Sequence, residues 1–420
     1  MKRIIHLILI LCFLATPALA DKILIPMDLA QHDHLKAYGV VYWTIKQGGK
    51  SEWLLNYRHG SFLCDDYEQL QRLCRLRGVS FEVISGAETA KIYATIEESN
   101  MEVVPLEKSP KIAVYAPSYY QPWDDAVLLA LTYAEIPYDQ IYDDEVLKGK
   151  LSDYDWLHLH HEDFTGQMGK FLRSYKNADW YLEHVAKDEA RAKQWGYPTV
   201  SELKKGVARE IRNYVSKGGF LFAMCSGTDT YDIALAAEGV DIVDSPYDGD
   251  PPDPNAQKKL DYSKCMAFTN FKLVFDPNEY EFSNIDMTKD SGRGFRDDDG
   301  DYFTLFEFSA KYDPVPTMLT QCHTSVVKGF MGQTTTFRRS LVKPSVIVMG
   351  EYEGRDEVKY IHSNFGKGFW TFYGGHDPED YRHMVGDPPT NLELHKNSPG
   401  YRLILNNVLF PAAKKKKLKT

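Results

Sequence analysis

The sequence predicts an α/β protein with a largely parallel β-sheet covered by helices. Short apolar runs typical of buried strands alternate with segments of helical periodicity, and the alternation starts again after a polar segment at residues 105–110. Within residues 218–229, an apolar run ends in small residues and a helix-compatible segment follows. We therefore expect a main α/β domain over residues 111–410, preceded by a smaller N-terminal α/β unit over residues 21–105.

The first twenty residues are typical of a signal peptide. Lys2 and Arg3 precede an apolar run, and Ala18-Leu19-Ala20 places small residues where a cleavage site requires them. We expect cleavage after Ala20 and a periplasmic or secreted protein. No later segment has an apolar run long enough to span a bilayer, so no stable membrane span is expected.

The charge distribution argues against nucleic acid as a partner. The formal net charge is −10, and the basic cluster lies in a tail at residues 411–420 that we interpret as solvated. A small-molecule substrate is the more reasonable expectation, and the sequence identifies no protein partner.

The N-terminal unit contains three predicted strands and three predicted helices in alternation. The strands are expected at residues 23–27, 53–57 and 79–84, and the helices at residues 34–47, 67–76 and 88–99. Alternation of this kind predicts a largely parallel sheet here too.

The main domain has a longer series of predicted strands and helices. Strands are expected at residues 112–116, 138–142, 155–160, 220–224, 346–351, 358–362 and 369–372. Helices are expected at residues 124–134, behind the capping residues Thr199 and Glu202, after Cys225, and from Pro399 to Leu409 with Ser398 as cap. Two less regular stretches, at residues 165–200 and 244–340, are interpreted as insertions.

Cys225 lies at the turn between an expected strand and an expected helix. The small residues Ala223 and Gly227 would permit a sharp turn that lifts the side chain toward the amino end of the helix. The helix dipole there favours the thiolate, which is the reactive form of cysteine. The alternative interpretation is a buried cysteine that ends a core strand.

The number of cysteines indicates whether Cys225 is a free thiol. Five remain after residue 20, and in an oxidising compartment an odd number suggests pairs plus one free thiol. Cys64 with Cys74 and Cys265 with Cys322 would leave Cys225 free, a hypothesis that depends on arithmetic alone.

The order of elements resembles the class I glutamine amidotransferase-like superfamily. The resemblance depends on the segment Asp-Tyr-Asp-Trp-Leu-His-Leu at residues 153–159, on Gly-Gly-Phe-Leu-Phe-Ala-Met-Cys-Ser-Gly at 218–227, and on Gly-Phe-Trp-Thr-Phe-Tyr-Gly-Gly-His-Asp-Pro-Glu at 368–379. It implies a flavodoxin-like parallel sheet with helices on both faces and the active site at the carboxyl ends of the strands.

The resemblance also implies catalytic roles. Cys225 would be the nucleophile, His376 the base, and Glu379 or Asp377 the carboxylate that orients the base. The amide of Ser226 and an amide from the loop at residues 163–166 would form the oxyanion hole. The implied function is a cysteine-dependent amidase or hydrolase acting on a small periplasmic substrate.

The sequence carries two further resemblances. The Gly-His-Asp ending is similar to the ThuA-like branch of the superfamily, which implies, as the alternative, a non-catalytic binding or accessory protein for a carbohydrate-type ligand. Ile25-Pro26-Met27-Asp28 and residues 34–39 resemble exported proteins of Bacteroidetes type that often carry the label asparagine synthetase B. That label implies no synthetase activity here, because such enzymes need an amino-terminal cysteine and a Ser-Gly-Gly-x-Asp-Ser loop for ATP.

A cluster of polar residues follows the expected strand at 155–160. His160, His161, Glu162 and Asp163 are expected to line the mouth of the pocket above Cys225, together with Gly227. With His158, His376 and Asp377 they could also approach a zinc-like site, but the spacing is not a strong metal signature. No metal or other cofactor is therefore assigned.

Overall fold

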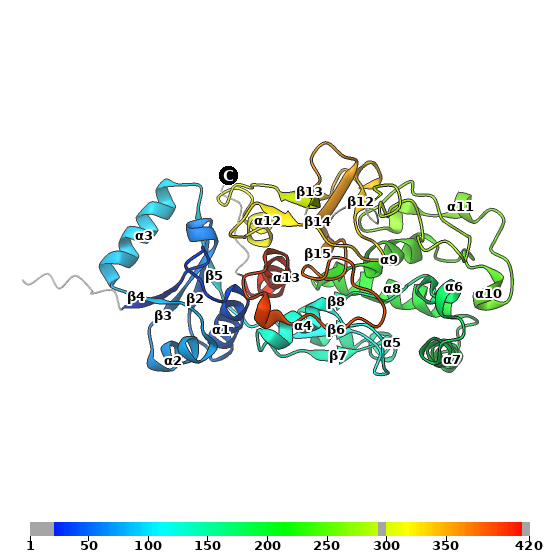
Figure 1. The fold of residues 1–420 in the computed structure, drawn as a ribbon, viewed down its shortest axis with the longest axis horizontal. Helices are drawn as coiled ribbons and strands as arrows, with labels where there is room; N and C mark the ends of the chain where they lie inside the picture. Colours follow the sequence, from blue (N-terminus) through cyan, green and yellow to red (C-terminus); the bar gives the residue numbers. More distant parts are fainter. Residues whose placement is uncertain (1–20, 293–299, 414–420) are drawn as a thin grey trace, which may run out of the picture.

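The computed structural model describes residues 21–292 and 300–413, so the predicted signal peptide and most of the basic tail lie outside the described residues. Figure 1 shows the N-terminal unit at one end of the molecule and the main domain at the other. The N-terminal unit contains β1 (Lys22–Ile25), α1 (His34–Lys46), β2 (Ser51–Leu55), β3 (Ser61–Asp65), α2 (Glu68–Arg77), β4 (Glu82–Ile84), α3 (Gly86–Glu98) and β5 (Glu102–Leu106).

The main domain begins with β6 and ends with α13. Its first half contains β6 (Ile112–Tyr115), α4 (Ala126–Tyr133), β7 (Asp139–Ile141), α5 (Asp143–Leu147), β8 (Trp156–Leu159), α6 (Leu172–Tyr175), α7 (Asp179–Gln194), α8 (Val200–Lys217), β9 (Phe220–Met224) and α9 (Ser226–Ala236). Its second half contains α10 (Ser245–Asp248), α11 (Ala256–Lys259), β10 (Tyr302–Leu305), α12 (Pro314–Leu319), β11 (Val326–Lys328), β12 (Phe337–Arg338), β13 (Ile347–Glu351), β14 (Glu357–Phe365), β15 (Gly368–Tyr373) and α13 (Pro399–Leu409).

The central part of the main sheet is parallel. Strands β7, β6, β8, β9 and β15 are neighbours in that order and pair in parallel. Numbered along the chain, this order is 2-1-3-4-5, the flavodoxin-like arrangement. Beyond β15 the sheet continues antiparallel through β14, β13, β10 and β11. The α/β fold expected from the sequence is confirmed, within a sheet of mixed direction.

Helices cover both faces of this sheet. Successive residues of a strand point to opposite faces, so each parallel strand contributes side chains to two cores. Phe220, Phe222 and Met224 of β9 pack into the core that holds α4 and α13. Leu221 and Ala223 pack into the second core, against α5, α8 and α9. The parallel strands are therefore buried on both faces, as their continuous apolar sequence predicts.

The sheet of the N-terminal unit differs from the prediction. Its order is β4-β1-β3-β2-β5, and every neighbouring pair is antiparallel. The prediction of a parallel sheet was wrong because β3 was not anticipated. A short connection in which Asn56, Arg58, His59 and Gly60 all have positive φ turns the chain straight back from β2 into β3.

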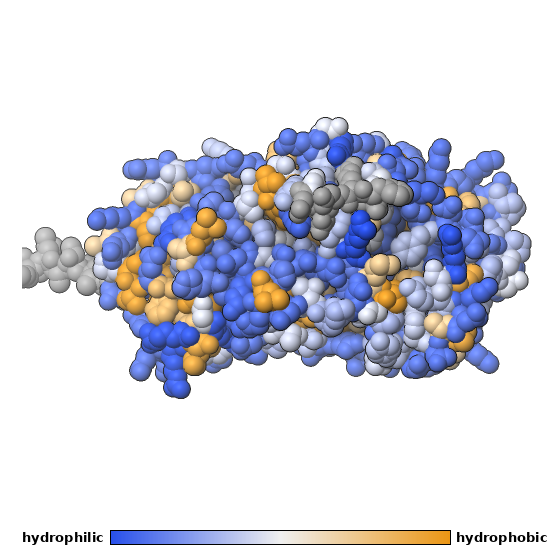
Figure 2. All heavy atoms as spheres, in the orientation of Figure 1, coloured by the Kyte–Doolittle hydropathy of each residue, from blue (hydrophilic) through white to orange (hydrophobic). Residues whose placement is uncertain are grey.

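The second insertion also contributes to the sheet. Residues 244–340 contain β10, β11 and β12, which extend or flank the antiparallel part, and a loop at residues 331–335 that returns over the end of β9. Within the described ranges, no helix combines the length and apolar character that crossing a membrane requires. Figure 2 shows one face of the molecule as mainly hydrophilic, with apolar residues in separate groups.

No disulfide joins the described cysteines; Cys64, Cys74, Cys225, Cys265 and Cys322 are free thiols. The hypothetical pairing of Cys265 with Cys322 fails because the two residues belong to the cores on opposite faces of the sheet. Cys64 instead has the Ser51 hydroxyl as its hydrogen-bond partner at 3.4 Å.

Candidate active site

Cys225 occupies a strained turn between β9 and α9. Its φ is 47° and its ψ is −137°, a conformation that residues with a Cβ rarely adopt. Gly227 permits the turn, since a Cβ at that position would lie 2.8 Å from the carbonyl oxygen of His160. The Gly227 amide donates to that oxygen at 2.7 Å, and the Ser226 hydroxyl donates to the His161 carbonyl at 2.8 Å. The end of β8 therefore fixes the amino end of α9 beneath Cys225.

The loop at residues 331–335 covers the sulfur of Cys225. The Gln333 amide donates to Sγ at 3.2 Å. This loop is fixed to the segment after β15, because the His376 amide donates to the Met331 carbonyl and the Gly375 amide to the Thr334 carbonyl, each at 2.8 Å. Backbone donors and the imidazole of His376 therefore approach the same sulfur.

These neighbours change the acidity of Cys225. Burial alone would raise the pKa of this thiol, but hydrogen bonding and charge from His376, together with the amides of Thr334 and Gln333, lower it below its ordinary value. The other described cysteines show the opposite shift: burial raises the pKa of Cys64 and Cys74 to about 12, and it also raises that of Cys265 and Cys322. Cys225 is therefore the one described cysteine whose pKa is lowered rather than raised, which favours the thiolate at this position.

The carboxylate beside His376 is Asp124. Its Oδ1 lies 3.6 Å from Nε2 of His376 and 2.8 Å from Nε2 of His383. Burial opposes the charge on His376, but Asp124 and the Cys225 sulfur raise its pKa to about 10. The imidazolium is therefore the form of His376 expected at neutral pH, between the carboxylate of Asp124 and the sulfur of Cys225.

Glu379 and Asp377 lie elsewhere. The carboxylate of Glu379 is 3.0 Å from Nδ1 of His395, and among the described residues no ion pair joins it to His376. Asp377 is buried, and its Oδ1 accepts the amide of Glu379 at 2.9 Å, so it shapes the turn after β15. The carboxylate paired with His376 is thus Asp124, whereas Glu379 is paired with His395 and Asp377 with the backbone of the turn.

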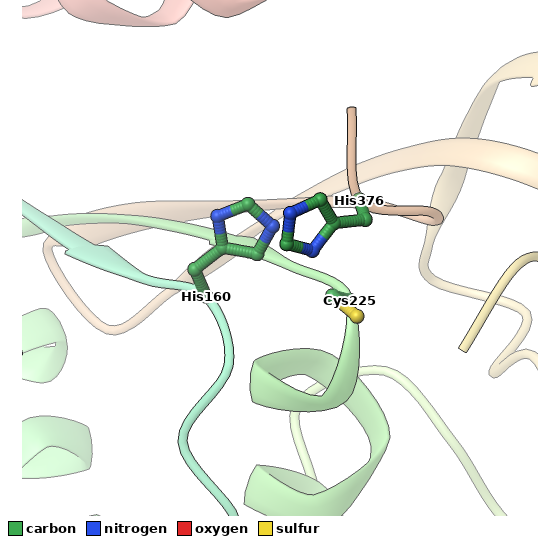
Figure 3. A group of neighbouring side chains, drawn as sticks. All are labelled: His160, Cys225 and His376. Atoms are coloured by element: carbon green, nitrogen blue, oxygen red, sulfur yellow. The ribbon is translucent and has the colours of Figure 1, made fainter. Parts of the chain in front are cut away.

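His160 and His161 follow β8 and lie beside His376. The ring centroids of His160 and His376 are 4.6 Å apart, and those of His161 and His376 are 4.5 Å apart. Figure 3 shows the imidazoles of His160 and His376 side by side, with Cys225 at the amino end of its helix. Asp125 lies behind His160, with its Oδ1 3.2 Å from Nδ1 of that ring. The expected approach of His160, His161 and His376 is thus present.

Glu162 and Asp163 do not line the cavity that borders Cys225. They border a separate cavity of about 50 Å³, and Glu162 accepts from the Tyr142 hydroxyl at 3.0 Å. Asp163 accepts from the amide of Thr165 at 2.7 Å, while the Phe164 amide donates to Thr230 at 3.2 Å. Both amides therefore already have partners, and the expected second oxyanion donor is not provided by Phe164 or Thr165.

A cavity of about 410 Å³ opens above Cys225. Aromatic side chains line much of it, namely Trp123, Phe171, Tyr175 and Tyr280. Cys225 is only 4% exposed, yet it borders this cavity together with His161, Ser226 and His376. A larger cavity of about 830 Å³ is lined by Phe220 and Phe369, which lie at the opposite, amino-terminal ends of β9 and β15.

Sequence reasoning missed several residues of this site. Asp124 and Asp125 were expected only as the start of a helix, although they follow a strand whose carboxyl end lies at the same edge as Cys225. That position was a usable signal. Gln333, Thr334 and His383 carried no comparable signal, because they lie in irregular segments.

The fold and the site together define a flavodoxin-like α/β protein with a cysteine on a strained elbow. No family model and no curated protein matches the sequence. Among solved structures, the chain is similar to Cytoplasmic Protein STM3548 from Salmonella typhimurium, with 10% identity, a TM-score of 0.34, and coverage of 73% of this chain and 100% of that one.

Two further solved structures give comparable values. Cytoplasmic Protein STM1381 from Salmonella typhimurium LT2 has 14% identity, a TM-score of 0.33, and coverage of 72% of this chain and 100% of that one. Gan42B, a GH42 beta-galactosidase, has 11% identity, a TM-score of 0.28, and coverage of 64% of this chain and 28% of that one. With TM-scores this low, the comparisons add nothing to the assignment of function.

Proposed function

We propose that this chain is an exported cysteine-dependent amidase or related hydrolase that acts on a small molecule in the cavity above Cys225. The observation that carries the proposal is the position of the Cys225 sulfur, on a strained elbow between His376 and the amide of Gln333. Strained backbone at a cavity is typical of a nucleophile that must be presented to a substrate. The resemblance to class I amidotransferases supports the same chemistry.

The first half of the proposed reaction forms a thioester. The Cys225 thiolate attacks the carbonyl carbon of a carboxamide, and the carbonyl electrons move onto oxygen. The Ser226 amide, the first of α9, is placed to donate to this oxyanion, because the first amides of a helix have no partner within it. His376 then gives its proton to the leaving nitrogen, and ammonia or an amine departs.

The second half releases the acid. A water molecule gives a proton to the neutral imidazole of His376 and attacks the thioester, after which the carboxylic acid leaves and the thiolate returns. Asp124, 3.6 Å from Nε2 of His376, stabilises the imidazolium in both halves of the cycle.

Alkylation of the native protein by iodoacetamide tests the nucleophile. Because the pKa of Cys225 is lowered while burial raises that of the other described cysteines, we expect modification at Cys225 alone, faster at pH 7 than that of a model thiol. Peptide mass spectrometry locates the modified residue. Incubation with p-nitrophenyl acetate should also leave an acetyl group on Cys225.

Cys265→Ser provides the matched control, since Cys265 is as buried as Cys225 but lies outside the cavity. This variant should retain both reactions, whereas Cys225→Ala should lose both. Alkylation of Cys225 no faster than a model thiol, with no acetyl-enzyme, would rule the nucleophile out.

The export part of the proposal depends on residues 1–20. If they act as a signal peptide, amino-terminal sequencing of protein from a periplasmic or culture fraction should begin at Asp21. Recovery of the unprocessed chain from the cytoplasm alone would argue against export.

The alternative is a ThuA-like protein that binds a carbohydrate-type ligand without covalent chemistry. The aromatic lining of the cavity favours it, because Trp123 and Phe171 stack with ring centroids 5.3 Å apart and could receive a sugar face. Under this alternative, Cys225→Ala should bind the ligand as tightly as the wild type, and Trp123→Ala should not. Glycan-array screening followed by calorimetry would distinguish these outcomes.

A further inference from the structure

We propose that Cys225, His160 and His376 also form a three-ligand site for a thiophilic divalent cation, with Zn²⁺ as the natural occupant. This site does not require Cys225 to be a nucleophile, so it stands or falls separately from the proposed hydrolase. It differs from the zinc-like grouping that the sequence suggested, because the thiol of Cys225 replaces the carboxylates that follow β8.

The three side chains place their donor atoms close together. One donor atom of each, namely Sγ of Cys225 and a ring nitrogen of each histidine, lies within 4.8 Å of the other two. Donors around a tetrahedral zinc ion lie roughly 3.3–3.8 Å apart, given bonds of about 2.0–2.3 Å. Side-chain movements of about 1 Å would therefore bring the three donor atoms to tetrahedral zinc distances. The exposed fractions of Cys225, His160 and His376 are 4%, 1% and 5%, so the three side chains are shielded from bulk water.

Consecutive aspartates support the two imidazoles from behind. Asp125 lies 3.2 Å from Nδ1 of His160, and Asp124 lies 3.6 Å from Nε2 of His376. A carboxylate behind each metal-bound histidine is a recurring arrangement, since it fixes the ring and increases its basicity. One pair of neighbouring residues thus orients both nitrogen ligands.

The Nε2 atom of His160 gives an independent indication that a cation binds here. Nε2 of this nearly fully buried ring has no hydrogen-bond partner among the described residues. Buried polar atoms without partners are rare in folded proteins and require an explanation. A cation between Nε2 of His160, the sulfur and His376 would satisfy this nitrogen.

The donor set selects the class of cation. One sulfur and two imidazole nitrogens suit Zn²⁺, whereas Mg²⁺ and Ca²⁺ require oxygen ligands. Three protein ligands leave a fourth position, and the cavity that borders Cys225 and His376 gives a small molecule or water access to it. Binding releases the proton that the Cys225–His376 pair holds and occupies the sulfur, so the metal-bound form cannot react with an electrophile.

Titration of the full chain with Co²⁺, a spectroscopic substitute for Zn²⁺, tests the site. We expect one equivalent to bind, with a thiolate-to-metal charge-transfer band and visible bands of tetrahedral intensity. Cys225→Ser should lose the charge-transfer band. His160→Gln should weaken binding at least about tenfold, and Asp125→Asn should weaken it by about 10–100-fold, the usual effect of removing the group behind a metal-bound histidine. Cys265→Ser, which changes a buried cysteine outside the site, should bind as the wild type does.

Wild-type protein gives a second measurement that does not depend on the variants folding. One equivalent of Zn²⁺ should slow alkylation of Cys225 at least about tenfold, and a chelator should restore it, since the metal occupies the sulfur. Absence of stoichiometric binding, or a Co²⁺ spectrum that is unchanged in folded Cys225→Ser or His160→Gln, would overturn the metal site. Slow alkylation of the metal-free protein would instead count against the hydrolase and leave the cobalt result intact.

Discussion

The backbone of Cys225 gives the first residue-scale prediction. With φ at 47°, an alanine or a cysteine at this position is strained, whereas glycine adopts such a conformation readily. Strain of this kind amounts to about 1–3 kcal/mol, which exceeds the 0.5–1 kcal/mol by which glycine is ordinarily less stable than alanine. We therefore expect Cys225→Gly to be more stable than Cys225→Ala by about 1 kcal/mol in urea unfolding.

Ala223 in β9 offers the matched comparison. Its backbone belongs to a regular buried strand, so Ala223→Gly should lower the free energy of unfolding in the ordinary direction. A Cys225→Gly variant less stable than Cys225→Ala would mean that the elbow stores no strain, and the argument for a presented nucleophile would lose its main support.

Asp124 leads to a prediction about pH dependence. Because Asp124 helps to raise the pKa of His376 to about 10, Asp124→Asn should lower that pKa and reduce the imidazolium fraction at neutral pH. Loss of the neighbouring positive charge should then raise the pKa of Cys225. The midpoint of the alkylation rate against pH should move upward by about one unit, and the rate at pH 7 should fall about tenfold.

Glu379→Gln is the control for Asp124→Asn, since the two substitutions remove the same charge at different places. Glu379 pairs with His395, so its variant should leave the pH profile of Cys225 unchanged. Equal shifts in the two variants would mean that overall charge, rather than the contact with His376, sets the acidity of the thiol.

Single residues also show what the sequence could and could not predict about the site. Cys225, His376, His160 and His161 were predicted to meet because each follows a strand of one parallel sheet, and the carboxyl ends of such strands share an edge. The resemblance to class I amidotransferases predicted Glu379 or Asp377, which follow His376 in the sequence, as the orienting carboxylate. In the structure, Asp124 lies beside His376 although the two residues are far apart in the sequence. Their contact depends on the order of the strands in the sheet, which the sequence pattern does not give.

At the scale of elements, the junction of β8 with α9 depends on Gly227. A Cβ there would meet His160 backbone atoms at 2.8 and 3.1 Å, and backbone cannot move aside as a flexible side chain can. We expect Gly227→Ala to lower the free energy of unfolding by about 1–3 kcal/mol, although alanine normally favours a helix. Alkylation of Cys225 should slow as well, because α9 must shift.

Gly300→Ala is the control for this substitution, since a Cβ at Gly300 meets no atom of the described residues within 4 Å. Its stability should stay within about 0.5 kcal/mol of the wild type. If Gly227→Ala were equally neutral, the close approach of β8 and α9 would not be needed to hold the elbow.

The elements themselves were predicted unevenly. Buried parallel strands and capped helices came out close to their observed bounds, as in α13, where Ser398 caps the helix and Pro399 starts it. The antiparallel N-terminal sheet was missed, because β3 follows a tight left-handed turn with few of the glycines that usually mark one. Strand direction is set by such turns and by long-range pairing, which periodicity does not report.

At the scale of the whole molecule, the two α/β parts share one core. Residues of α1 and of the N-terminal strands pack in the same cluster as α4 and α13 of the main domain. Figure 1 shows α13 where the two parts meet. We therefore expect the N-terminal unit to stabilise the helical layer behind the site and to unfold together with it.

Arg402 of α13 tests this coupling. It is fully buried, and it donates to the Met27 carbonyl at 2.8 Å, to the Tyr38 hydroxyl at 3.2 Å and to the carbonyl of His59, all in the N-terminal unit. Arg402→Leu removes three hydrogen bonds from a buried charged donor, which should lower the free energy of unfolding by about 3 kcal/mol or more. Urea unfolding followed by far-ultraviolet circular dichroism and tryptophan fluorescence measures it.

Arg209→Leu is the matched control, because Arg209 is 46% exposed in its side chain and pairs with Glu238 at the surface. Its effect should stay within about 0.5–1 kcal/mol. The wild type should unfold in one transition by both probes, and Arg402→Leu should unfold earlier or in two steps. A wild type with two separate transitions, or an Arg402→Leu variant as stable as Arg209→Leu, would show that the two parts fold independently and that the shared core contributes little to the site.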